Sequence, residues 1–448
     1  MLERLFKLKE HNTNVKTEII AGITTFMTMA YILIVNPQIL SGAGMDSTAV
    51  LLATCIASFI GCICMAFMAN MPFVLSAGMG LNIYFATSIV QNMNVPWQMA
   101  LFAVFVEGLI FIVLSLTKVR EAIFNSIPLA LKNAVSVGVG IYIAFIGMQG
   151  AKLVVDSGNT LVTIVAFNKE NFTTEGICAI LALVGTLLTA FLYIKKVKGS
   201  ILIGILATWV MGMICQAIGL YTGYSLYPNL GLPDFTKLGL TFGQAFKLDF
   251  SAVNLLEFAI VIMAFLFVDI FDTLGTVIGV SAKAKMLDEQ GRLPKINRVL
   301  LADAVATTAG AVLGTSTVTT FVESSTGVEA GGRTGLTTLT AGVLFLIAML
   351  FSNIFTVIPG FATAPALIIV GFLMFTNIVN IKLDDDYATV IPAYLCIIGM
   401  PFFYSISEGL AIGVISYVVL NLLTGKAKKI SPIMYVLAVL FILKYIFL

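Results

Sequence analysis

The sequence predicts an all-α polytopic membrane protein with about fourteen transmembrane segments, judged by the length of chain that crosses a bilayer. Hydrophobic residues make up 59% of the 448 residues and charged residues only 11%. A soluble domain cannot bury that much apolar surface, so the lipid bilayer is the expected surrounding of most helices. The apolar residues also form long runs, and the basic residues gather between alternate runs.

The apolar runs define the predicted segments. They are residues 18–40, 47–69, 72–91, 96–116, 128–151, 174–194, 200–220, 254–280, 298–314, 315–333, 335–358, 361–380, 387–404 and 406–424. A last apolar piece, 432–448, is long enough either to cross the bilayer or to lie along its surface.

The distribution of basic residues predicts the orientation. If the N-terminus is cytoplasmic, these segments place most of the 25 Lys and Arg residues on the cytoplasmic side, as the positive-inside rule requires. We therefore expect a multi-pass protein of the bacterial cell inner membrane. The N-terminal stretch lacks the compact apolar core of a cleavable signal peptide. The net charge of +2 argues against nucleic acid as a partner.

The longest polar interval, 221–253, divides the chain into two halves of similar size. Each half contains about seven segments, and because seven is odd, the halves would enter the membrane in opposite orientations, as in inverted-repeat transporters. The third and tenth segments then occupy equivalent positions, as do the first and the eighth.

The third and tenth segments share an interrupted pattern. Pro72, Gly78 and Gly80 disfavour a continuous helix in the third, which predicts an extended piece at 72–76 and a helix starting between residues 76 and 80. In the tenth, hydroxyl-bearing residues dominate 315–326, and the β-branched residues clustered there favour a strand. Thr326-Gly327-Val328-Glu329 has the form of a capping box that opens a helix. The first segment carries an Asn36-Pro37 break near its end.

Extended backbone at membrane depth must pair within the protein or line a cavity. We therefore expect the two short strands to pair with one another near the middle of the bilayer. The half-helices that follow them would direct their positive N-terminal ends at a bound ligand.

Three acids lie where an ionised group is costly. Asp269 and Asp272 fall in the eighth segment and Glu323 in the tenth, and a charge at the bilayer centre costs about 2.5–3.5 kcal/mol even on lenient scales. The spacing of the two aspartates to Thr273 and Thr276 places all four on one helical face. This pattern predicts a transporter whose cargo site contains the acids.

Several motifs resemble those of a known family. GITTFMTMAYILIVNPQIL, SAGMGLN, FLFVDIFDTLGT and GTSTVTTFVESSTGVEAGGRTG occur in order along the chain and resemble the AzgA-like purine (hypoxanthine/guanine/adenine) permeases of the nucleobase/ascorbate transporter superfamily. The similarity runs over nearly the whole chain. One departure is Ala77, where many relatives have proline.

The resemblance implies a fold of two inverted repeats divided into a core domain and a gate domain. The core comprises residues 1–127 and 254–358, and the gate comprises 128–253 and 359–448. Movement of core against gate would expose a midplane site to either side in turn. The resemblance also implies proton symport and a homodimer formed through the gate domains.

Matched motif by motif, the resemblance implies functional roles for Asn82, Asp269, Asp272 and Glu323. The predicted substrate-binding residues, in a site for a purine nucleobase, are Asp269, Glu323, Asn82, Phe26, Thr320, Phe321 and Val322. Glu323 and Asp269 would grip the base edges by charge-assisted hydrogen bonds, with backbone N–H groups near Phe321 and Val322 as donors. Asn82 would orient an acid or touch the base, and Phe26 would stack on the ring or serve packing.

Proton coupling is expected to involve Asp272 or Asp269. Burial and a neighbouring carboxylate both favour the neutral form of an acid, so one of the three acids should carry a proton near neutral pH. Glu107 and Asp303, which also lie inside segments, are expected to be structural. The run Asp384, Asp385 and Asp386 reads as a solvated loop.

Other functions fit the residues less well. No metal or cofactor is expected, because the six cysteines fall in apolar runs without metal-site company. A membrane enzyme would need a nucleophile–base pair or a metal, and the one histidine, His11, lies outside the membrane. A channel, or a carrier of another nucleobase-like solute such as uracil or xanthine, remains an alternative.

Overall fold

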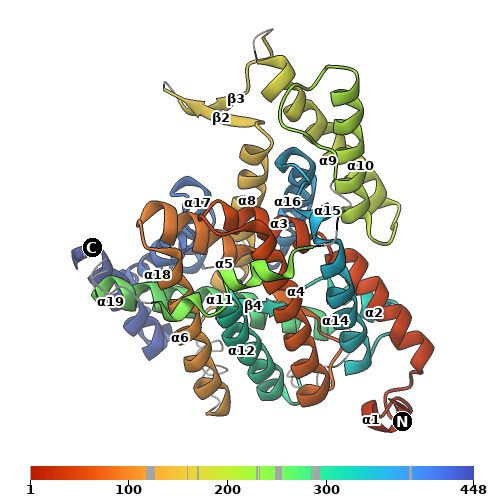
Figure 1. Ribbon diagram of the computed structural model, residues 1–448. Coiled ribbons are helices and arrows are strands. Elements are labelled where there is room, and N and C mark those ends of the chain that lie inside the picture. Colours follow the sequence, from red (N-terminus) through yellow and green to blue (C-terminus); the bar gives the residue numbers. More distant parts are fainter. Residues whose placement is uncertain are drawn as a thin grey trace.

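Figure 1 shows the computed structural model, which describes residues 2–117, 127–158, 160–168, 171–228, 231, 233–247, 255–283, 286, 293–382 and 386–447. Most of these residues are helical. The predicted loop acids Asp384 and Asp385 lie outside the described residues.

One group of helices packs around α4 and α12, and we term it the acid bundle because it carries Asp269, Asp272 and Glu323. Figure 1 shows α4, α12 and α14 side by side within it. π-Helical stretches extend α4 and α5, over Met65–Ala69 and Tyr84–Asn92. The helices of the acid bundle are α1 (Leu2–Phe6), α2 (Val15–Met29), α3 (Ile32–Ser41), α4 (Ser47–Cys64), α5 (Met79–Ile83), α6 (Trp97–Leu116), α11 (Leu255–Lys283), α12 (Ile296–Leu313), α13 (Ser324–Glu329), α14 (Gly335–Ala348) and α15 (Ser352–Phe355).

The remaining helices pack mainly on α8 and α16 and form the second bundle. Its elements are α8 (Leu129–Gly150), α9 (Ile177–Ile194), α10 (Ser200–Ala217), α16 (Gly360–Phe375), α17 (Tyr387–Phe402), α18 (Ile406–Leu423) and α19 (Pro432–Phe447). Glycines let α8 and α16 approach closely, since a Cβ on Gly140 would lie 2.6 Å from the carbonyl oxygen of Gly371. The two bundles meet where α8 contacts α5 and α11, and where α10 contacts α2.

Within the described residues, ten helical stretches are long and apolar enough to cross a membrane. They are Val15–Ser41, Ser47–Ala69, Trp97–Leu116, Leu129–Gly150, Phe172–Ile194, Ser200–Ala217, Ile296–Leu313, Gly335–Phe355, Gly360–Asn380 and Ile406–Leu423. The prediction of a helical polytopic membrane protein is confirmed at this level. The predicted third and tenth segments are not among the ten stretches, because a strand interrupts each of them.

The strands of the described residues form two small sheets. β1 (Leu75–Ala77) pairs antiparallel with β4 (Val318–Thr320), with Leu75 opposite Thr320 and Ala77 opposite Val318. β2 (Val154–Ser157) and β3 (Leu161–Ile164) form a hairpin that projects beyond the end of α8 (Figure 1). The pairing of β1 with β4 joins the third predicted segment to the tenth inside the acid bundle.

The first span breaks at Ala30 and Tyr31, nearly two turns before the Asn36-Pro37 position that the sequence indicated. α2 ends at Met29 and α3 begins at Ile32, whereas Pro37 lies inside α3. A proline lacks the backbone N–H of its own turn and its ring crowds the carbonyl of the residue four positions before it, here Leu33. The disruption therefore falls upstream of Pro37, at Ala30 and Tyr31.

The capping box predicted at Thr326 was wrong. α13 begins at Ser324, and the residue at its cap, Glu323, makes no side-chain capping bond. After β4 ends at Thr320, the chain turns at once, with the Ser324 N–H donating to the Phe321 carbonyl at 3.1 Å. Helical winding has therefore started before Thr326, whose hydroxyl donates back to the Glu323 carbonyl at 2.7 Å.

Candidate functional site

The backbone pairing of β1 and β4 creates the framework of the site. Beyond the strands, the Gly78 N–H donates to the Thr317 carbonyl at 2.9 Å, and the Phe321 N–H donates to the Val74 carbonyl at 3.0 Å. The polar backbone is thus satisfied by protein, as a location away from water requires. α5 and α13 begin directly after the two strands, so their N-terminal ends lie close to the same paired backbone.

Glu323 lies at the start of α13 and is held by the break in the first span. Its side chain is buried, and the Tyr31 hydroxyl donates to Glu323 Oε1 at 2.6 Å. One turn along each helix, the hydroxyls of Thr28 and Thr326 are 3.0 Å apart. The junction of α2 and α3 therefore fixes both the carboxylate and the helix that carries it.

Asp269 belongs to a second buried group formed by α11 and α12. The Thr273 hydroxyl lies 2.9 Å from Asp269 Oδ1 and 3.2 Å from Asp303 Oδ2, and all three side chains are fully buried. A hydroxyl has a single hydrogen, so it donates to one acid at a time.

Asp272 lies one turn along α11 from Asp269 and faces the paired strands. The Thr319 hydroxyl, on β4, lies 3.3 Å from Asp272 Oδ2. α11, which carries Asp269 and Asp272, packs against both β4 and α13, and Glu323 lies at the cap of α13. The structure therefore brings the three predicted acids into one neighbourhood built from α11, β4 and α13.

Asn82 lies on α5, fully buried, and its closest hydrogen bond goes to another amide. Its Nδ2 donates to Asn36 Oδ1 at 2.5 Å, and Asn36 in turn donates to Thr54 at 2.7 Å and Thr315 at 3.0 Å. The side-chain amide oxygen of Asn82, Oδ1, is buried without a hydrogen-bond partner among the described residues. In this conformation Asn82 joins an amide and hydroxyl network rather than orienting a carboxylate directly.

The other predicted substrate-binding residues differ in burial and in hydrogen bonding. Phe26 packs its edge against Phe345 at 5.2 Å between ring centroids, which provides the packing role. The Phe321 N–H is occupied by the Val74 carbonyl, so it is not free to donate to a ligand. Thr320 is buried with no partner for its hydroxyl, while Val322 is 42% exposed.

Sequence reasoning placed Thr273 on the face of the two aspartates, but it missed Tyr31 as the side chain that holds Glu323. Tyr31 sits within an apolar run, and only Pro37 downstream signalled that the helix opens near it. Asp303, expected to be structural, shares the Thr273 hydroxyl with Asp269. Glu107 receives a hydrogen bond from Thr317 at 3.3 Å, so it too contacts the tenth segment.

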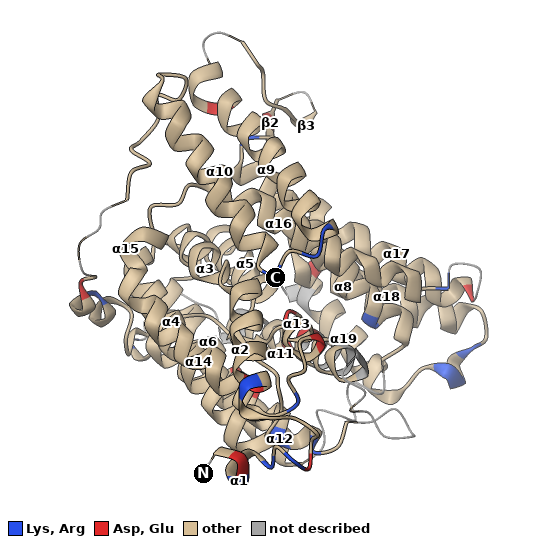
Figure 2. Ribbon diagram, turned by 90° about the vertical axis from the view of Figure 1, so that its right-hand side faces the viewer, with Lys and Arg blue, Asp and Glu red and all other residues tan. Residues whose placement is uncertain are grey.

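The charges of the molecule separate by position. Figure 2 shows most Lys and Arg residues at the ends and loops of the helices, whereas acidic residues on α13 lie among the helices. Buried acids favour binding of a group that donates hydrogen bonds or carries a proton. The site can therefore grip N–H groups and take up a proton.

Comparison with known proteins supports a transport role. The model of the Permease family matches residues 16–408. The chain belongs to this permease family. The guanine/hypoxanthine permease PbuG of Bacillus subtilis is 42% identical to this permease, covering 100% of both chains. The adenine permease AdeP of Escherichia coli is 38% identical over 100% of this chain and 96% of its own.

These relatives place this permease among the purine permeases of the nucleobase/ascorbate group, as the motifs predicted. Because its relatives are permeases, this chain is a transporter and not an enzyme. The transmembrane domain of the cyanobacterial bicarbonate transporter BicA shares the fold, with a TM-score of 0.61 at 15% identity over 91% of this chain and 96% of that domain.

Proposed function

We propose that this permease takes up purine nucleobases, guanine and hypoxanthine ahead of adenine, by proton symport across the bacterial inner membrane. The names of its relatives support a nucleobase cargo. The single observation that carries the proposal is the gathering of Asp269, Asp272 and Glu323 at the paired strands β1 and β4.

The chemistry of a purine fits these groups. A purine base is flat, uncharged near neutral pH, and edged with N–H donors and ring-nitrogen or carbonyl acceptors. Glu323 and Asp269 accept N–H groups of the base, and hydrogen bonds to ionised acceptors are about twice as strong as neutral ones. A site built on such bonds also rejects analogues that lack the matching groups.

The coupling proton binds at Asp272 or Asp269. Asp272 contacts the strand that leads to Glu323, so a change in its charge acts directly on the substrate site. Asp269 and Asp303 both lie against the Thr273 hydroxyl, and a proton on one of the two acids would reduce the repulsion between them. Neutralising one acid lowers the cost of moving the loaded site past apolar surroundings.

Alternating access follows from two bundles that move against each other. The acid bundle acts as the core and the second bundle as the gate, in a fold of about fourteen segments and two inverted repeats. A Cβ on Gly199, in the turn between α9 and α10, would lie 3.3 Å from the carbonyl oxygen of Met27. The turn between α9 and α10 therefore touches the first span, so movement of the gate against the core changes this contact. Two copies associate through their gate domains.

Uptake measurements test the proposal. Cells that lack their own purine transporters and express this permease should accumulate labelled hypoxanthine and guanine, and a protonophore should abolish the accumulation. Uptake that ignores the protonophore would refute proton coupling. Uptake of uracil in place of the three purines would refute the purine assignment, and uptake of xanthine in their place would refute the assignment to guanine, hypoxanthine and adenine. Currents without saturation would indicate a channel.

The variant Asp272→Asn tests the coupling residue. We expect it to bind purines and to exchange labelled for unlabelled base, because Glu323 and Asp269 are intact, yet to lose pH-driven accumulation. Exchange and accumulation are measured in the same proteoliposomes with and without an imposed pH gradient. Normal accumulation by this variant would exclude Asp272, and the same assay on Asp269→Asn would then decide between the two acids.

A further inference from the structure

Tyr31 is the one side chain of the described residues that reaches Glu323 through a side-chain hydrogen bond from another element. Its ring is fully buried, with 1% of its surface exposed. The break between α2 and α3 places it there, because neither helix includes residue 31. A bond of 2.6 Å between a hydroxyl and a carboxylate oxygen belongs to the short, charge-assisted class.

This bond divides the two oxygens of Glu323 between different tasks. Oε1 accepts from Tyr31, while no side chain of the described residues donates to Oε2. Among side chains of the described residues, therefore, only Tyr31 donates to this carboxylate, at Oε1, and the backbone N–H of Glu323 itself is its other hydrogen-bond partner. Thr326 adds rigidity, since its hydroxyl is bonded to the Glu323 carbonyl and also lies 3.0 Å from the Thr28 hydroxyl.

Guanine and hypoxanthine differ in how many carboxylate oxygens are required to accept the N–H groups on the edge that carries N1. Hypoxanthine presents a single N–H on the edge that carries N1, which one carboxylate oxygen satisfies. Guanine adds a 2-amino group beside N1–H, and these two parallel donors fit both oxygens of one carboxylate. Oε1 already accepts from Tyr31, so the second donor of guanine would share this oxygen with the phenol, and two donors on one oxygen weaken each other's hydrogen bonds.

We propose that Tyr31 is a specificity-determining residue that lowers the preference of this permease for guanine relative to hypoxanthine by occupying Oε1 of Glu323. The inference rests on the proposed function, because it takes Glu323 to be the residue that receives N1–H. Tyr31 acts through Glu323 and is therefore a positioning residue.

The variant Tyr31→Phe tests it, because it removes the hydroxyl and keeps the ring. We expect the ratio of the KM for guanine to the KM for hypoxanthine to fall about tenfold, since a hydrogen bond to a charged group contributes about 1.5–3 kcal/mol and 1.4 kcal/mol is tenfold. A purely structural role would weaken uptake of both bases together and leave the ratio unchanged. An unchanged ratio, with uptake by the wild-type protein intact, overturns the proposed role of Tyr31 and leaves the proposed function standing.

Controls separate the remaining outcomes. Tyr404→Phe removes a partly buried bond of similar length, to Gln149 Oε1 at 2.7 Å in the second bundle, and should leave the ratio unchanged. If Tyr31→Phe does not reach the membrane, 3-fluorotyrosine at position 31 keeps the shape and strengthens the donor, so the ratio should rise. An unchanged ratio there also overturns the proposal. Wild-type protein that carries neither base refutes the proposed function, and the role of Tyr31 falls with it.

Discussion

Gly327→Ala is expected to loosen the substrate site by pushing α13 away from α2. A Cβ at Gly327 would overlap the Thr25 hydroxyl oxygen and would lie 2.9 Å from the Ala21 carbonyl oxygen, whereas ordinary contact begins at 3.4 Å. Backbone on one side and a buried threonine on the other leave little room for adjustment. Overpacking of this kind typically costs about 1–3 kcal/mol.

The strain should reach the acid directly. Glu323 lies one turn before Gly327, and its bond to Tyr31 spans the same pair of elements. We therefore expect Gly327→Ala to lower the melting temperature of the detergent-solubilised protein and to raise the KM for purine, with the protein still inserted in the membrane. Binding is measured by purine-dependent thermal stabilisation and transport by initial uptake rates.

A second substitution checks the physical cause. Thr25→Ala removes the hydroxyl that the new methyl group meets, so the double variant should recover part of both losses, because residues in contact are coupled. The remaining approach to the Ala21 carbonyl limits the recovery. The reasoning is refuted if Gly327→Ala retains wild-type stability and KM, or if the two substitutions simply add.

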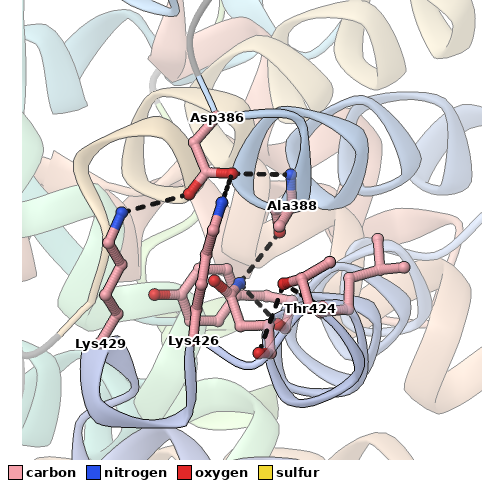
Figure 3. A network of polar contacts seen from close by, with 8 residues as sticks. Asp386, Ala388, Thr424, Lys426 and Lys429 are labelled. Carbon is pink, nitrogen blue, oxygen red and sulfur yellow. Dashed lines mark hydrogen bonds and ion pairs between the residues drawn. The ribbon is translucent and has the colours of Figure 1, made fainter.

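Two further predictions concern the second bundle. Asp386 caps α17 and binds Lys426 at 2.6 Å (Figure 3), and the hydrogen bond from that lysine is the main cause that lowers its pKa. A lowered pKa contributes its full stabilisation above the ordinary pKa of an aspartate, and the contribution is lost as the pH falls. We therefore expect Asp386→Asn to lower the free energy of unfolding by less than about 1 kcal/mol at pH 7, and this deficit to shrink below about pH 4 in melting curves. An equal deficit at both pH values contradicts this. Tyr142→Phe removes a 2.9 Å bond to Thr87 that joins the two bundles, so it should change the transport rate more than the purine Kd, as seen by comparing uptake with equilibrium binding. A change in Kd alone would exclude a role for this bond in bundle movement.

The sequence predicted which segments carry the acids, but not which side chains surround them. Polar residues in apolar runs, together with two runs interrupted by glycine, proline or hydroxyl residues, identified the segments that meet at β1 and β4. Periodicity also placed Asp269, Asp272 and Thr273 on one face of a helix. These features depend on composition and local spacing, which a single sequence displays.

Contacts between segments that are distant along the chain could not be predicted from the sequence. Nothing local indicates that Tyr31 reaches Glu323, that Asp303 shares a hydroxyl with Asp269, or that Asn82 bonds Asn36. These contacts depend on how helices from different parts of the chain pack. The errors at Pro37 and Thr326 had another source, since in each case tertiary packing moved a helix end by several residues from the position that local signals favoured.

The antiparallel ladder between β1 and β4 also constrains how the protein is made. While the ribosome is still translating the second half, the backbone groups of residues 74–78 lack the partners that residues 317–321 later supply. A nascent chain in lipid cannot leave those groups bare. Until the second half is made, the backbone of the third segment must therefore contact water or a chaperone. The protein gains its ability to bind substrate late in biogenesis, when the two halves dock.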